Sequence, residues 1–426
     1  MESVSVLHIN TWGGIGGAFI ASDRLHTALL NSGIDSTLAY GKVFKNSDSE
    51  IKELNHYIAI KKDNKIEGIL TKLLKKVGLN DIGYISSFEL INHEYFKRAT
   101  ALNFHNIHSD YFSYLALSIL TANKPAVFTL HDMWSFTGHC AYSYDCERWK
   151  TGCGKCPYPD SQPSICIDNT HLEWKLKNWV YNRSNLTIVT PSSWLAEQAK
   201  QSMLNRFPIH HIPYGIDTEA YQPLDPEECR SLLGIPTGKK VLMFGAQSLT
   251  DSRKGGDLLL KALQTFPPSL TNETVLLTLG DGGEAISQTV GMATVNLGYV
   301  SNDRLKSIAY SAADLFIFPT RADNLPLVLQ ESMACGTPMV SFKVGGVPDL
   351  VRPGITGYLA TPEDADDFCN GIVELLEDEN LRDRMSQNCR AIALTEYPLE
   401  LQAQRYIELY HQVLNRQVSD ECKAFT

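Results

Sequence analysis

The stretch from Asp323 to Pro338, DNLPLVLQESMACGTP, lies between two apolar runs, DLFIFPT and PMVSFKV, that read as buried strands. The pattern between these runs predicts a helix that begins near Pro326 and ends at Gly336-Thr337-Pro338. Asp323 then lies at the N-terminal mouth of the helix, and Glu331 lies roughly two turns further along. Two interpretations stay open here. Both carboxylates border one cavity, or Asp323 caps the helix and Glu331 is a solvated surface residue.

The alternation of short apolar runs with helical patterns continues along the chain, which is typical of parallel α/β layers. Residues 43–100 do not fit this alternation. The first half contains VSVLHIN, STLAYG, ALNFHNIH, AVFTLHD and LTIVTPS; the second adds KKVLMFGAQ, VLLTLGDG, TVNLGYV and TGYLATP. Residues 209–228, IHHIPYGIDTEAYQPLDPEE, interrupt the pattern with Pro, Gly and acidic turn residues. We therefore expect two α/β domains joined near residue 213.

Composition limits the class of protein. A chain of 426 residues with 43% apolar and 20% charged residues is long enough for two or three soluble domains. The net charge of -10 argues against a general nucleic-acid binder. The opening SVSVLHIN reads as a strand rather than a signal peptide, and no apolar run approaches the roughly 20 residues that span a bilayer. We expect a cytoplasmic protein with reduced cysteines.

Two helical patterns stand apart from the alternation. Residues 399–416 predict an amphipathic helix with one apolar side, formed by Leu401, Tyr406, Leu409, Tyr410 and Leu414. Residues 66–79, IEGILTKLLKKVGL, predict a basic amphipathic helix, with Ile66, Ile69, Leu70, Leu73 and Leu74 on one face and Lys72, Lys75 and Lys76 on the other. The second helix either packs on its own domain or contacts anionic lipid at a membrane surface.

Two loops between a strand and a helix have the composition of anion sites. NTWGGIGGAF, residues 10–19, lets the backbone approach a ligand and precedes a helix N-terminus. The next strand ends in AYGK without an acid, which argues against a dinucleotide site. In the second half, Arg253 and Lys254 directly precede a helix, where two cations can converge on a diphosphate. The alternative there is a solvated basic pair.

Residues 323–360, DNLPLVLQESMACGTPMVSFKVGGVPDLVRPGITGYLA, resemble the donor-binding signature of family-four retaining glycosyltransferases with the GT-B fold. The resemblance extends to GGAF, IPYGID, RKG, LGDG, LGYV and AYSAADLFIFPT, in the family's order. It implies two Rossmann-like, doubly wound α/β domains facing a cleft, with the C-terminal helix crossing back to the first. The domains would be residues 1–212 with about 398–426, on the acceptor side, and 213–397, on the nucleotide-sugar side.

The resemblance assigns roles residue by residue. Glu331 would accept hydrogen bonds from ribose hydroxyls, and Asp323 replaces the family glutamate that faces the transferred sugar. The implied catalytic residues are His131, Asp323 and Lys254. The implied donor-binding residues are Gly16, Gly17, Arg253, Lys254, Tyr299, Val300, Asn324, Leu325, Pro326, Leu327 and Glu331. The family's arginine falls near Gln247, so we assign its duty to Arg253.

The implied chemistry is transfer of a hexose from a UDP- or GDP-linked donor to a glycan or lipid-linked acceptor in surface polysaccharide biosynthesis. Front-face attack with retention would depend on positioning and electrostatic stabilisation of the leaving diphosphate. No catalytic metal is expected, because Arg253 and Lys254 supply the positive charge. The protein would work in the cytoplasm, with peripheral contact to the inner membrane surface and no nucleic-acid partner.

A cysteine cluster at residues 138–158, GHCAYSYDCERWKTGCGKCPY, is an insertion in the first domain. Cys140, Cys146, Cys153 and Cys156 have the composition of a tetrahedral, structural zinc site, with His139 as a substitute ligand. A thiol cluster without metal and an iron–sulfur site stay open as alternatives. Two further functions also stay open. One is a nucleotide-sugar epimerase with the same fold, and the other is a zinc-dependent binding module.

Overall fold

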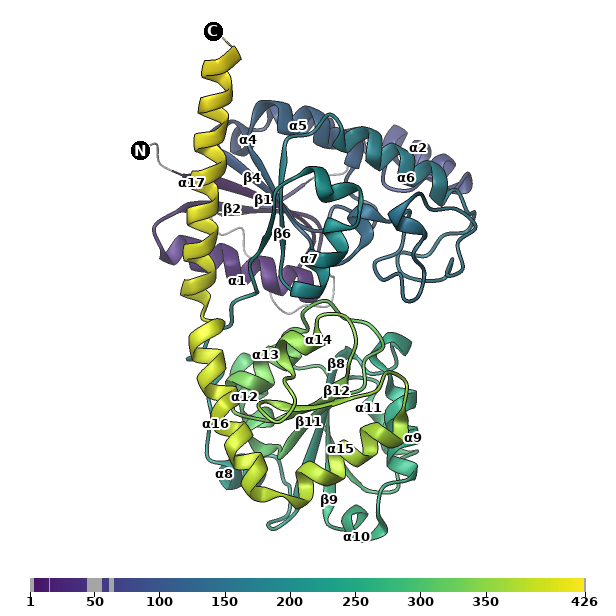
Figure 1. Cartoon of the computed structure of the whole chain (residues 1–426), viewed down its shortest axis with the longest axis vertical. Coiled ribbons are helices and arrows are strands. Elements are labelled where there is room, and N and C mark those ends of the chain that lie inside the picture. The colour runs from purple at the N-terminus through teal and green to yellow at the C-terminus, as the bar shows by residue number, and fades with distance from the viewer. Residues whose placement is uncertain (1–3, 15, 44–55, 61–64, 425–426) are drawn as a thin grey trace. The chain divides into compact units, whose positions relative to one another are not determined.

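The computed structural model describes residues 4–14, 16–43, 56–60 and 65–424. The chain divides into two compact units (Figure 1). Unit 1 is Met1–Pro213 with Glu400–Thr426, and unit 2 is Tyr214–Leu399. Each unit is a parallel sheet with helices packed on it, as the alternation of apolar runs and helical patterns predicted.

The sheet of unit 1 has seven strands in the order β3-β2-β1-β4-β5-β6-β7, and every neighbouring pair is parallel. The strands are β1 (Ser5–Gly13), β2 (Asp35–Val43), β3 (Tyr57–Ala59), β4 (Ala101–Phe104), β5 (Ala126–Thr129), β6 (Leu186–Thr190) and β7 (Ile209–His211). The α-helices of this unit are α1 (Gly17–Asn31), α2 (Lys65–Lys76), α3 (Ser86–Glu89), α4 (Glu94–Arg98), α5 (Leu117–Asn123), α6 (Thr170–Tyr181) and α7 (Ser193–Lys200). Between these elements lie short 3-10 turns at Leu90–Asn92, Tyr114–Ala116, Trp134–Phe136, Arg148–Lys150 and Met203–Arg206.

The sheet of unit 2 has six parallel strands in the order β10-β9-β8-β11-β12-β13. The strands are β8 (Lys240–Ser248), β9 (Thr274–Asp281), β10 (Ala293–Asn296), β11 (Leu315–Phe318), β12 (Met339–Phe342) and β13 (Gly357–Ala360). The helices are α8 (Pro226–Leu232), α9 (Gly256–Gln264), α10 (Pro268–Thr271), α11 (Gly283–Ser287), α12 (Asp303–Ala312), α13 (Leu327–Ala334), α14 (Val347–Leu350), α15 (Ala365–Glu377) and α16 (Glu379–Glu396), with a 3-10 turn at Ser252–Lys254.

Both sheets reverse their strand order at one point. In unit 1 the reversal lies between β1 and β4, and in unit 2 it lies between β8 and β11. Ligands of doubly wound sheets bind at such switch points, outside the carboxyl ends of the strands. The loop after β8 carries Arg253 and Lys254, and the loop after β11 carries Asp323. The loops after β1 and β4 carry Gly16 and His105.

The long helix α17 (Leu399–Ala424) packs its tyrosines on the sheet of unit 1. Tyr406, Leu409 and Tyr410 are buried, as the sequence predicted. Asn103 Nδ2 donates to Tyr410 Oη at 2.9 Å. Thr129 Oγ1 donates to Asn103 Oδ1 at 2.9 Å, so the contact of 3.0 Å between Thr129 Oγ1 and Tyr406 Oη must use the tyrosine proton. The predicted crossing of this helix back to the first domain is therefore confirmed.

The eleven apolar runs quoted from the sequence all contain strands of the two sheets. Two strands were not predicted. β3 lies within residues 43–100, where the alternation was expected to fail, and β7 lies within the stretch that we interpreted as an interruption. Both are edge strands of three residues, too short to show a period in the sequence. Within the described residues, no helix is both long and apolar enough to cross a bilayer.

Candidate functional site

A charged cluster lies at the switch point of unit 2. The side chain of Lys254 donates from Nζ to Asp323 Oδ2 at 2.5 Å, and Arg253 Nη1 lies 3.1 Å from the same oxygen. Arg253 Nη1 also donates to the Ala322 carbonyl at 2.9 Å. The sequence placed these three charged residues in two separate loops, and the structure brings them together. The solvated-pair interpretation of Arg253 and Lys254 is wrong, because both cations are held by Asp323.

Burial sets the electrostatics of this charged cluster. Loss of solvent lowers the pKa of Lys254, Arg253 lowers it further, and Asp323 opposes both effects. Burial would raise the pKa of Asp323, but Lys254 and Arg253 outweigh it, and the pKa is lowered. The carboxylate is therefore ionised at neutral pH and pairs with both cations, and a second carboxylate, Asp251 Oδ2, lies 3.5 Å from Arg253 Nη2.

Two glycines allow the loops of the charged cluster to approach closely. A Cβ at Gly255, which has a φ of +73°, would lie 1.8 Å from the Pro319 carbonyl oxygen. A Cβ at Gly345 would lie 2.0 Å from the Asp323 carbonyl oxygen, and the neighbouring Gly346 N–H donates to that oxygen at 3.1 Å. The glycines of the RKG and GG motifs thus hold the backbone on both sides of Asp323.

The helix α13 excludes the second of the two interpretations given for the carboxylates. Its N-cap is Pro326 and no side chain caps it, so Asp323 is not the cap. Glu331 is only 4% exposed and accepts a hydrogen bond from Tyr310 Oη at 3.2 Å, so it is not a solvated surface residue. A carboxylate with two oxygens keeps acceptor capacity beyond one phenol. Both carboxylates are buried, Asp323 in the loop after β11 and Glu331 within α13.

The remaining predicted donor residues of unit 2 lie on neighbouring loops. Asn324, Leu325, Pro326 and Leu327 form the buried turn that leads into α13. Tyr299 is half exposed and Val300 is buried, both between β10 and α12. Gln247 is exposed near the end of β8, so no arginine occupies the place where the resemblance expects one.

The glycine loop of unit 1 opens α1. Gly16 is the N-cap residue with a φ of 90°, and Gly17 is the first helical residue. A Cβ built at either position meets nothing within 4 Å, so the backbone there faces open space. The helix begins two residues before Phe19, where the sequence placed its start. Ile15, inside this loop, lies outside the described residues.

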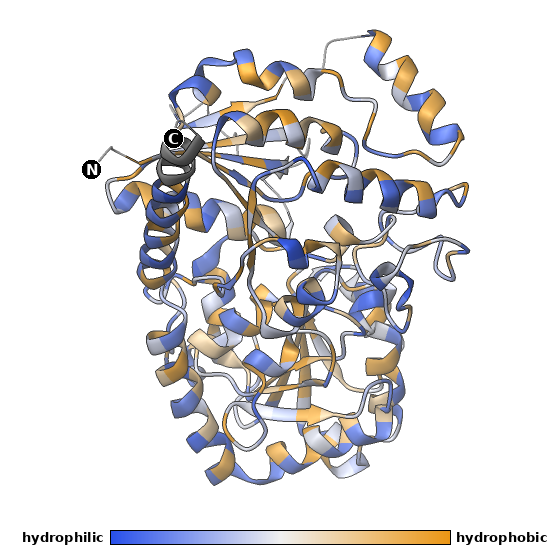
Figure 2. Cartoon of the chain, turned by 45° about the horizontal axis from the view of Figure 1, so that its top comes forward, coloured by the Kyte–Doolittle hydropathy of each residue, from blue (hydrophilic) through white to orange (hydrophobic). Residues whose placement is uncertain are grey.

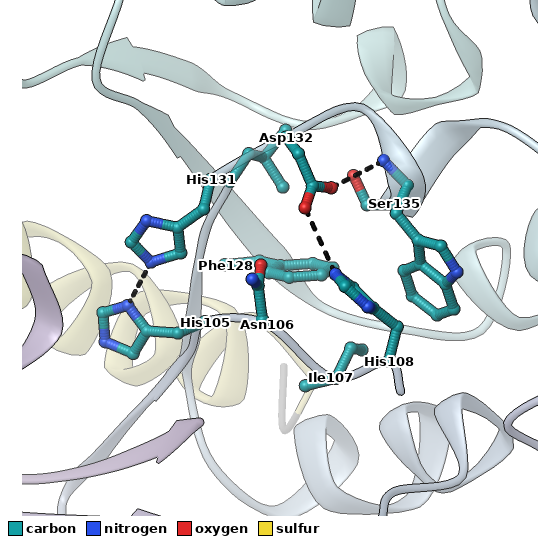
Figure 3. Close-up of a pocket in the computed structure, with 10 residues that line it drawn as sticks. His105, Asn106, Ile107, His108, Phe128, His131, Asp132 and Ser135 are labelled. Atoms are coloured by element: carbon teal, nitrogen blue, oxygen red, sulfur yellow. Dashed lines mark hydrogen bonds and ion pairs between the residues drawn. The ribbon is translucent and has the colours of Figure 1, made fainter. Parts of the chain in front are cut away.

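His131 follows β5 and lies in a polar group at the strand ends of unit 1 (Figure 3). Its Nε2 lies 2.9 Å from His105 Nδ1, and the two rings stack with centroids 5.2 Å apart. Burial lowers the pKa of His131 to about 4, with a smaller raising effect from Asp132 and a lowering effect from His108. His131 is therefore a neutral imidazole at physiological pH.

A second pair beside His131 was not predicted. His108 Nε2 lies 3.2 Å from Asp132 Oδ2, and Asp132 Oδ1 accepts the Trp134 N–H at 2.8 Å (Figure 3). These residues and His105 line a cavity of about 10 Å³. The signal was present in the sequence, because ALNFHNIH ends one strand and AVFTLHD ends its neighbour. Parallel neighbours bring such ends to one edge.

The four cysteines of the insertion line one cavity of about 20 Å³. His139 Nε2 lies 3.2 Å from Cys156 Sγ, and Gly138 N–H donates to Cys153 Sγ at 3.2 Å. Burial raises the pKa of Cys140 to about 12 and that of Cys153 to about 11, so both are thiols at neutral pH. Over the described part of the chain, no three His, Cys, Asp or Glu side chains are grouped as metal ligands. The zinc site stays a prediction.

Two family models match the chain in succession. Residues 15–220 match the model described as Glycosyltransferase Family 4, and residues 227–392 match Glycosyl transferases group 1. The chain is 26% identical over 352 residues to a protein of Escherichia coli K12 named for colanic acid biosynthesis, the glycosyl transferase WcaC; the match covers 79% of this chain and 83% of that protein.

Solved structures share the fold. Sucrose-phosphate synthase of Thermosynechococcus elongatus superposes with a TM-score of 0.71 at 19% identity, over 97% of this chain and 100% of that one. HepE of Anabaena, in complex with UDP and glucose, superposes with a TM-score of 0.65 at 17% identity, over 96% of this chain and 100% of that one. These neighbours establish the GT-B fold of two parallel-sheet α/β domains.

Proposed function

The chain belongs to glycosyltransferase family 4 and is a transferase, and from this premise we propose that it moves a hexose from a nucleotide sugar to a glycan or lipid-linked acceptor with retention. The proposed pathway is surface polysaccharide biosynthesis, which the name of the WcaC relative supports. A UDP-linked donor is the first choice, because the HepE neighbour binds UDP and glucose; a GDP-linked donor is the second.

The observation that carries this proposal is the charged cluster of Arg253, Lys254 and Asp323 at the switch point of unit 2. Lys254 has three N–H donors, so it can hold Asp323 and a phosphate oxygen at the same time. Two cations within reach of one diphosphate stabilise the charge that develops as it leaves. Asp323 then faces the transferred sugar, and the turn at 324–327 offers backbone N–H groups to sugar and phosphate.

We assign the nucleoside to residues on the same unit. Glu331 is held by Tyr310 and would accept the ribose hydroxyls through its remaining acceptor capacity. Tyr299 and Val300 would contact the base through the backbone. From unit 1, the proposal assigns Gly16 and Gly17 to the diphosphate and His131 to the donor sugar, as the family resemblance implies. No step in this scheme requires a divalent metal, because the cations act in its place.

The experiment is a screen of nucleotide sugars by thermal shift, followed by turnover with and without candidate acceptors. The expected product is a glycoside whose anomeric proton shows the configuration of the donor by NMR. An inverted product would contradict retention. A nucleotide sugar consumed without any acceptor, with release of an epimerised sugar, would support the epimerase alternative instead.

Helix α2 supports the proposed contact with a membrane. Three of its apolar residues point outward, since Ile66 is 68% exposed, Ile69 61% and Leu73 57%, while Leu70 and Leu74 are partly buried. The buried face is polar and consists of Glu67 and Thr71, and Glu67 accepts from Ser86 Oγ at 2.9 Å. The ribbon of α2 accordingly alternates between hydrophobic and hydrophilic residues (Figure 2). The sequence-based view that the apolar face packs on its own domain is wrong for these three residues.

The charges of α2 favour an anionic lipid surface. Lys65, Lys72 and Lys76 are exposed, and their spacing of seven and four residues places them in one row beside the apolar stripe. This arrangement is typical of helices that lie in the headgroup region. The protein as a whole carries a net charge of -10, so the attraction has to be local.

Vesicle flotation tests the membrane contact. The full chain should float with vesicles that contain phosphatidylglycerol and much less with phosphatidylcholine alone, and Leu73→Glu should abolish flotation. The matched control is Leu232→Glu on α8, another leucine of high exposure at 73%. Equal flotation of the Leu73 variant and the wild type would exclude α2 as the contact.

The cysteine insertion is proposed to hold one structural zinc ion. Its support is that Cys140, Cys146, Cys153 and Cys156 line a common cavity, with the thiolate-type donors that zinc prefers. Binding has to deprotonate the thiols, so metal uptake should release protons. Elemental analysis of protein purified in reducing buffer should find about one zinc per chain. A folded protein without zinc under those conditions would end this part of the proposal.

A further inference from the structure

Three histidines of unit 1 form a hydrogen-bonded chain, which we call the histidine chain. His8 Nδ1 lies 3.0 Å from His105 Nε2, and His105 Nδ1 lies 2.9 Å from His131 Nε2. The rings stack in order, with centroids 5.3 Å and 5.2 Å apart and interplanar angles of 22° and 27°. All three side chains are buried. The last contact, between His105 and His131, is visible at the strand ends (Figure 3).

The strand register explains why these rings meet. His8 on β1 pairs with Asn103 on β4, and Asn103 pairs with Val127 on β5. His105 lies two residues beyond Asn103, and His131 lies four beyond Val127, so each histidine is two residues nearer the carboxyl edge than the one before. Steps of two residues keep side chains on one face of the sheet.

Each ring of the histidine chain is neutral, so each carries one proton. Burial lowers the pKa of His8 and of His105 well below the usual value, with smaller lowering effects from neighbouring histidines, and lowers that of His131 to about 4. A neutral imidazole donates from one nitrogen and accepts at the other. Each of the two N···N contacts therefore uses one proton, and the tautomer of one ring fixes the tautomers of the other two.

The end of the histidine chain at His8 decides which tautomers form. Among the described residues, His8 Nε2 is buried and has no hydrogen-bond partner. The nearby ring of His26 on α1 has its centroid 6.2 Å away, and its own Nε2 also lacks a partner, so the two rings do not satisfy one another. A buried N–H without an acceptor is among the rarest defects in native proteins, rarer than an acceptor without a donor. The proton of His8 therefore belongs on Nδ1.

We propose that His8 and His105 are positioning residues that hold His131 in its Nδ1–H tautomer. His8 Nδ1–H donates to His105 Nε2, and His105 Nδ1–H donates to His131 Nε2. The Nε2 lone pair of His131 is then occupied, and its proton lies on Nδ1. The sequence places the three histidines in or directly after separate strands, and the register of these strands brings their rings together.

The consequence for the reaction rests on the proposed function, in which His131 faces the donor sugar. A His131 fixed as Nδ1–H offers a hydrogen bond to a hydroxyl or carbonyl oxygen of the sugar and has no free lone pair to act as a general base. The histidine chain also cannot supply protons, because among the described residues His8 Nε2 has no hydrogen-bond partner from which a proton could come. Sugars with an acceptor oxygen at this position are favoured over deoxy analogues.

Histidine labelled with nitrogen-15 and long-range proton–nitrogen correlation show which ring nitrogen holds the proton. In the ligand-free protein, His131 should give the Nδ1–H pattern, assigned by its loss in His131→Phe. His105→Phe keeps a ring in the stack but removes the donor, and it should shift His131 toward the Nε2–H form. The control is His211→Phe, at the exposed end of β7, which should leave the signals of the histidine chain unchanged.

Activity supplies a second measurement. His105→Phe should raise the donor KM up to about tenfold, as expected for the loss of one hydrogen bond. The effect should be smaller with a donor that lacks the contacted oxygen. An Nε2–H form of His131 in the wild type, or an unchanged tautomer in His105→Phe, would overturn the proposal. The tautomer is measured without substrate, so a failure of the proposed transferase activity leaves this result standing.

Discussion

The two units carry polar clusters at the switch points of their sheets. The cluster in unit 2 is made of charged side chains, and the cluster in unit 1 is made of neutral ones. In unit 2, Lys254 and Arg253 share the carboxylate of Asp323 in two ion pairs. In unit 1, the histidine chain consists of neutral rings in which every contact uses one proton. Topology alone does not decide what a switch point does. The residue types after the strands do.

The difference in charge suggests different functions for the two clusters. A charged cluster whose cations are paired internally can exchange part of that pairing for an anionic ligand, so its contribution should depend on charge and on salt. A neutral chain of rings has no charge to exchange, but it fixes the direction of each N–H group. We expect the first cluster to determine how strongly the donor binds, and the second to determine how the sugar is oriented.

Removal of residues 401–426 should have the largest effect of the changes considered, and it should affect unit 1 while leaving the charged cluster of unit 2 intact. Loss of α17 uncovers the sheet face around Asn103 and Thr129, and the lost burial of Tyr406, Leu409 and Tyr410 costs about 1.5–3 kcal/mol each. Transfer should be abolished, while the charged cluster in unit 2 should still bind UDP in calorimetry. Full activity of the truncated chain would mean that α17 is an accessory.

Lys254→Ala tests the charged cluster directly. Transfer should fall about 10²–10³-fold, because a preorganised cation that stabilises the leaving diphosphate is lost. Binding of the nucleoside alone, without phosphates, should change little. Lys261→Ala, an exposed lysine of α9, is the matched control. If both variants turn over at the wild-type rate, Lys254 has no role in the reaction.

Glu331→Ala should weaken nucleotide binding by about 1–3 kcal/mol, because the ribose hydroxyls lose a charged acceptor. Tyr310 loses its partner at 3.2 Å as well, so Tyr310→Phe is needed to separate the two effects. That variant should retain most of the affinity. The exposed Glu377→Ala on α15 serves as the control for loss of an acidic side chain. Unchanged affinity in the Glu331 variant would remove this residue from the site.

The neutral cluster predicts a pH effect on stability. Burial lowers the pKa of His131 to about 4, from an unfolded value of about 6.5. Between these values the unfolded chain binds more protons, so stability falls as the pH drops below about 6.5. At pH 5.5 this one residue should cost about 1.4 kcal/mol relative to pH 8. Denaturant unfolding of wild type and His131→Gln measures it: the variant should lose less stability on acidification.

The strands and the donor loop could be predicted because their signals are local. Apolar runs such as DLFIFPT are bounded by turn residues, and the spacing from Asp323 to Glu331 is carried by one helix and its entry loop. The salt bridge between Lys254 and Asp323 joins residues from different loops, so only the resemblance brought them into one site. β3 and β7 were missed because three residues show no period.

Other features of unit 1 could not be predicted from the sequence for the same reason. The contact of His8 with His105 depends on the register of β1 against β4, which no stretch of residues displays. For α2 the sequence shows two faces but not which one is buried. The buried face is the one that carries Glu67, whose hydrogen-bond partner Ser86 lies outside the helix.

The return of α17 to unit 1 has a consequence for biosynthesis. Domains generally fold in order as the ribosome releases them. Here the sheet that begins at Ser5 receives its covering tyrosines only when residues 406 and 410 have left the ribosome, after all of unit 2 has been made. Unit 2 is continuous in sequence and can fold first. The first part of the chain to be translated is therefore the last to be completed.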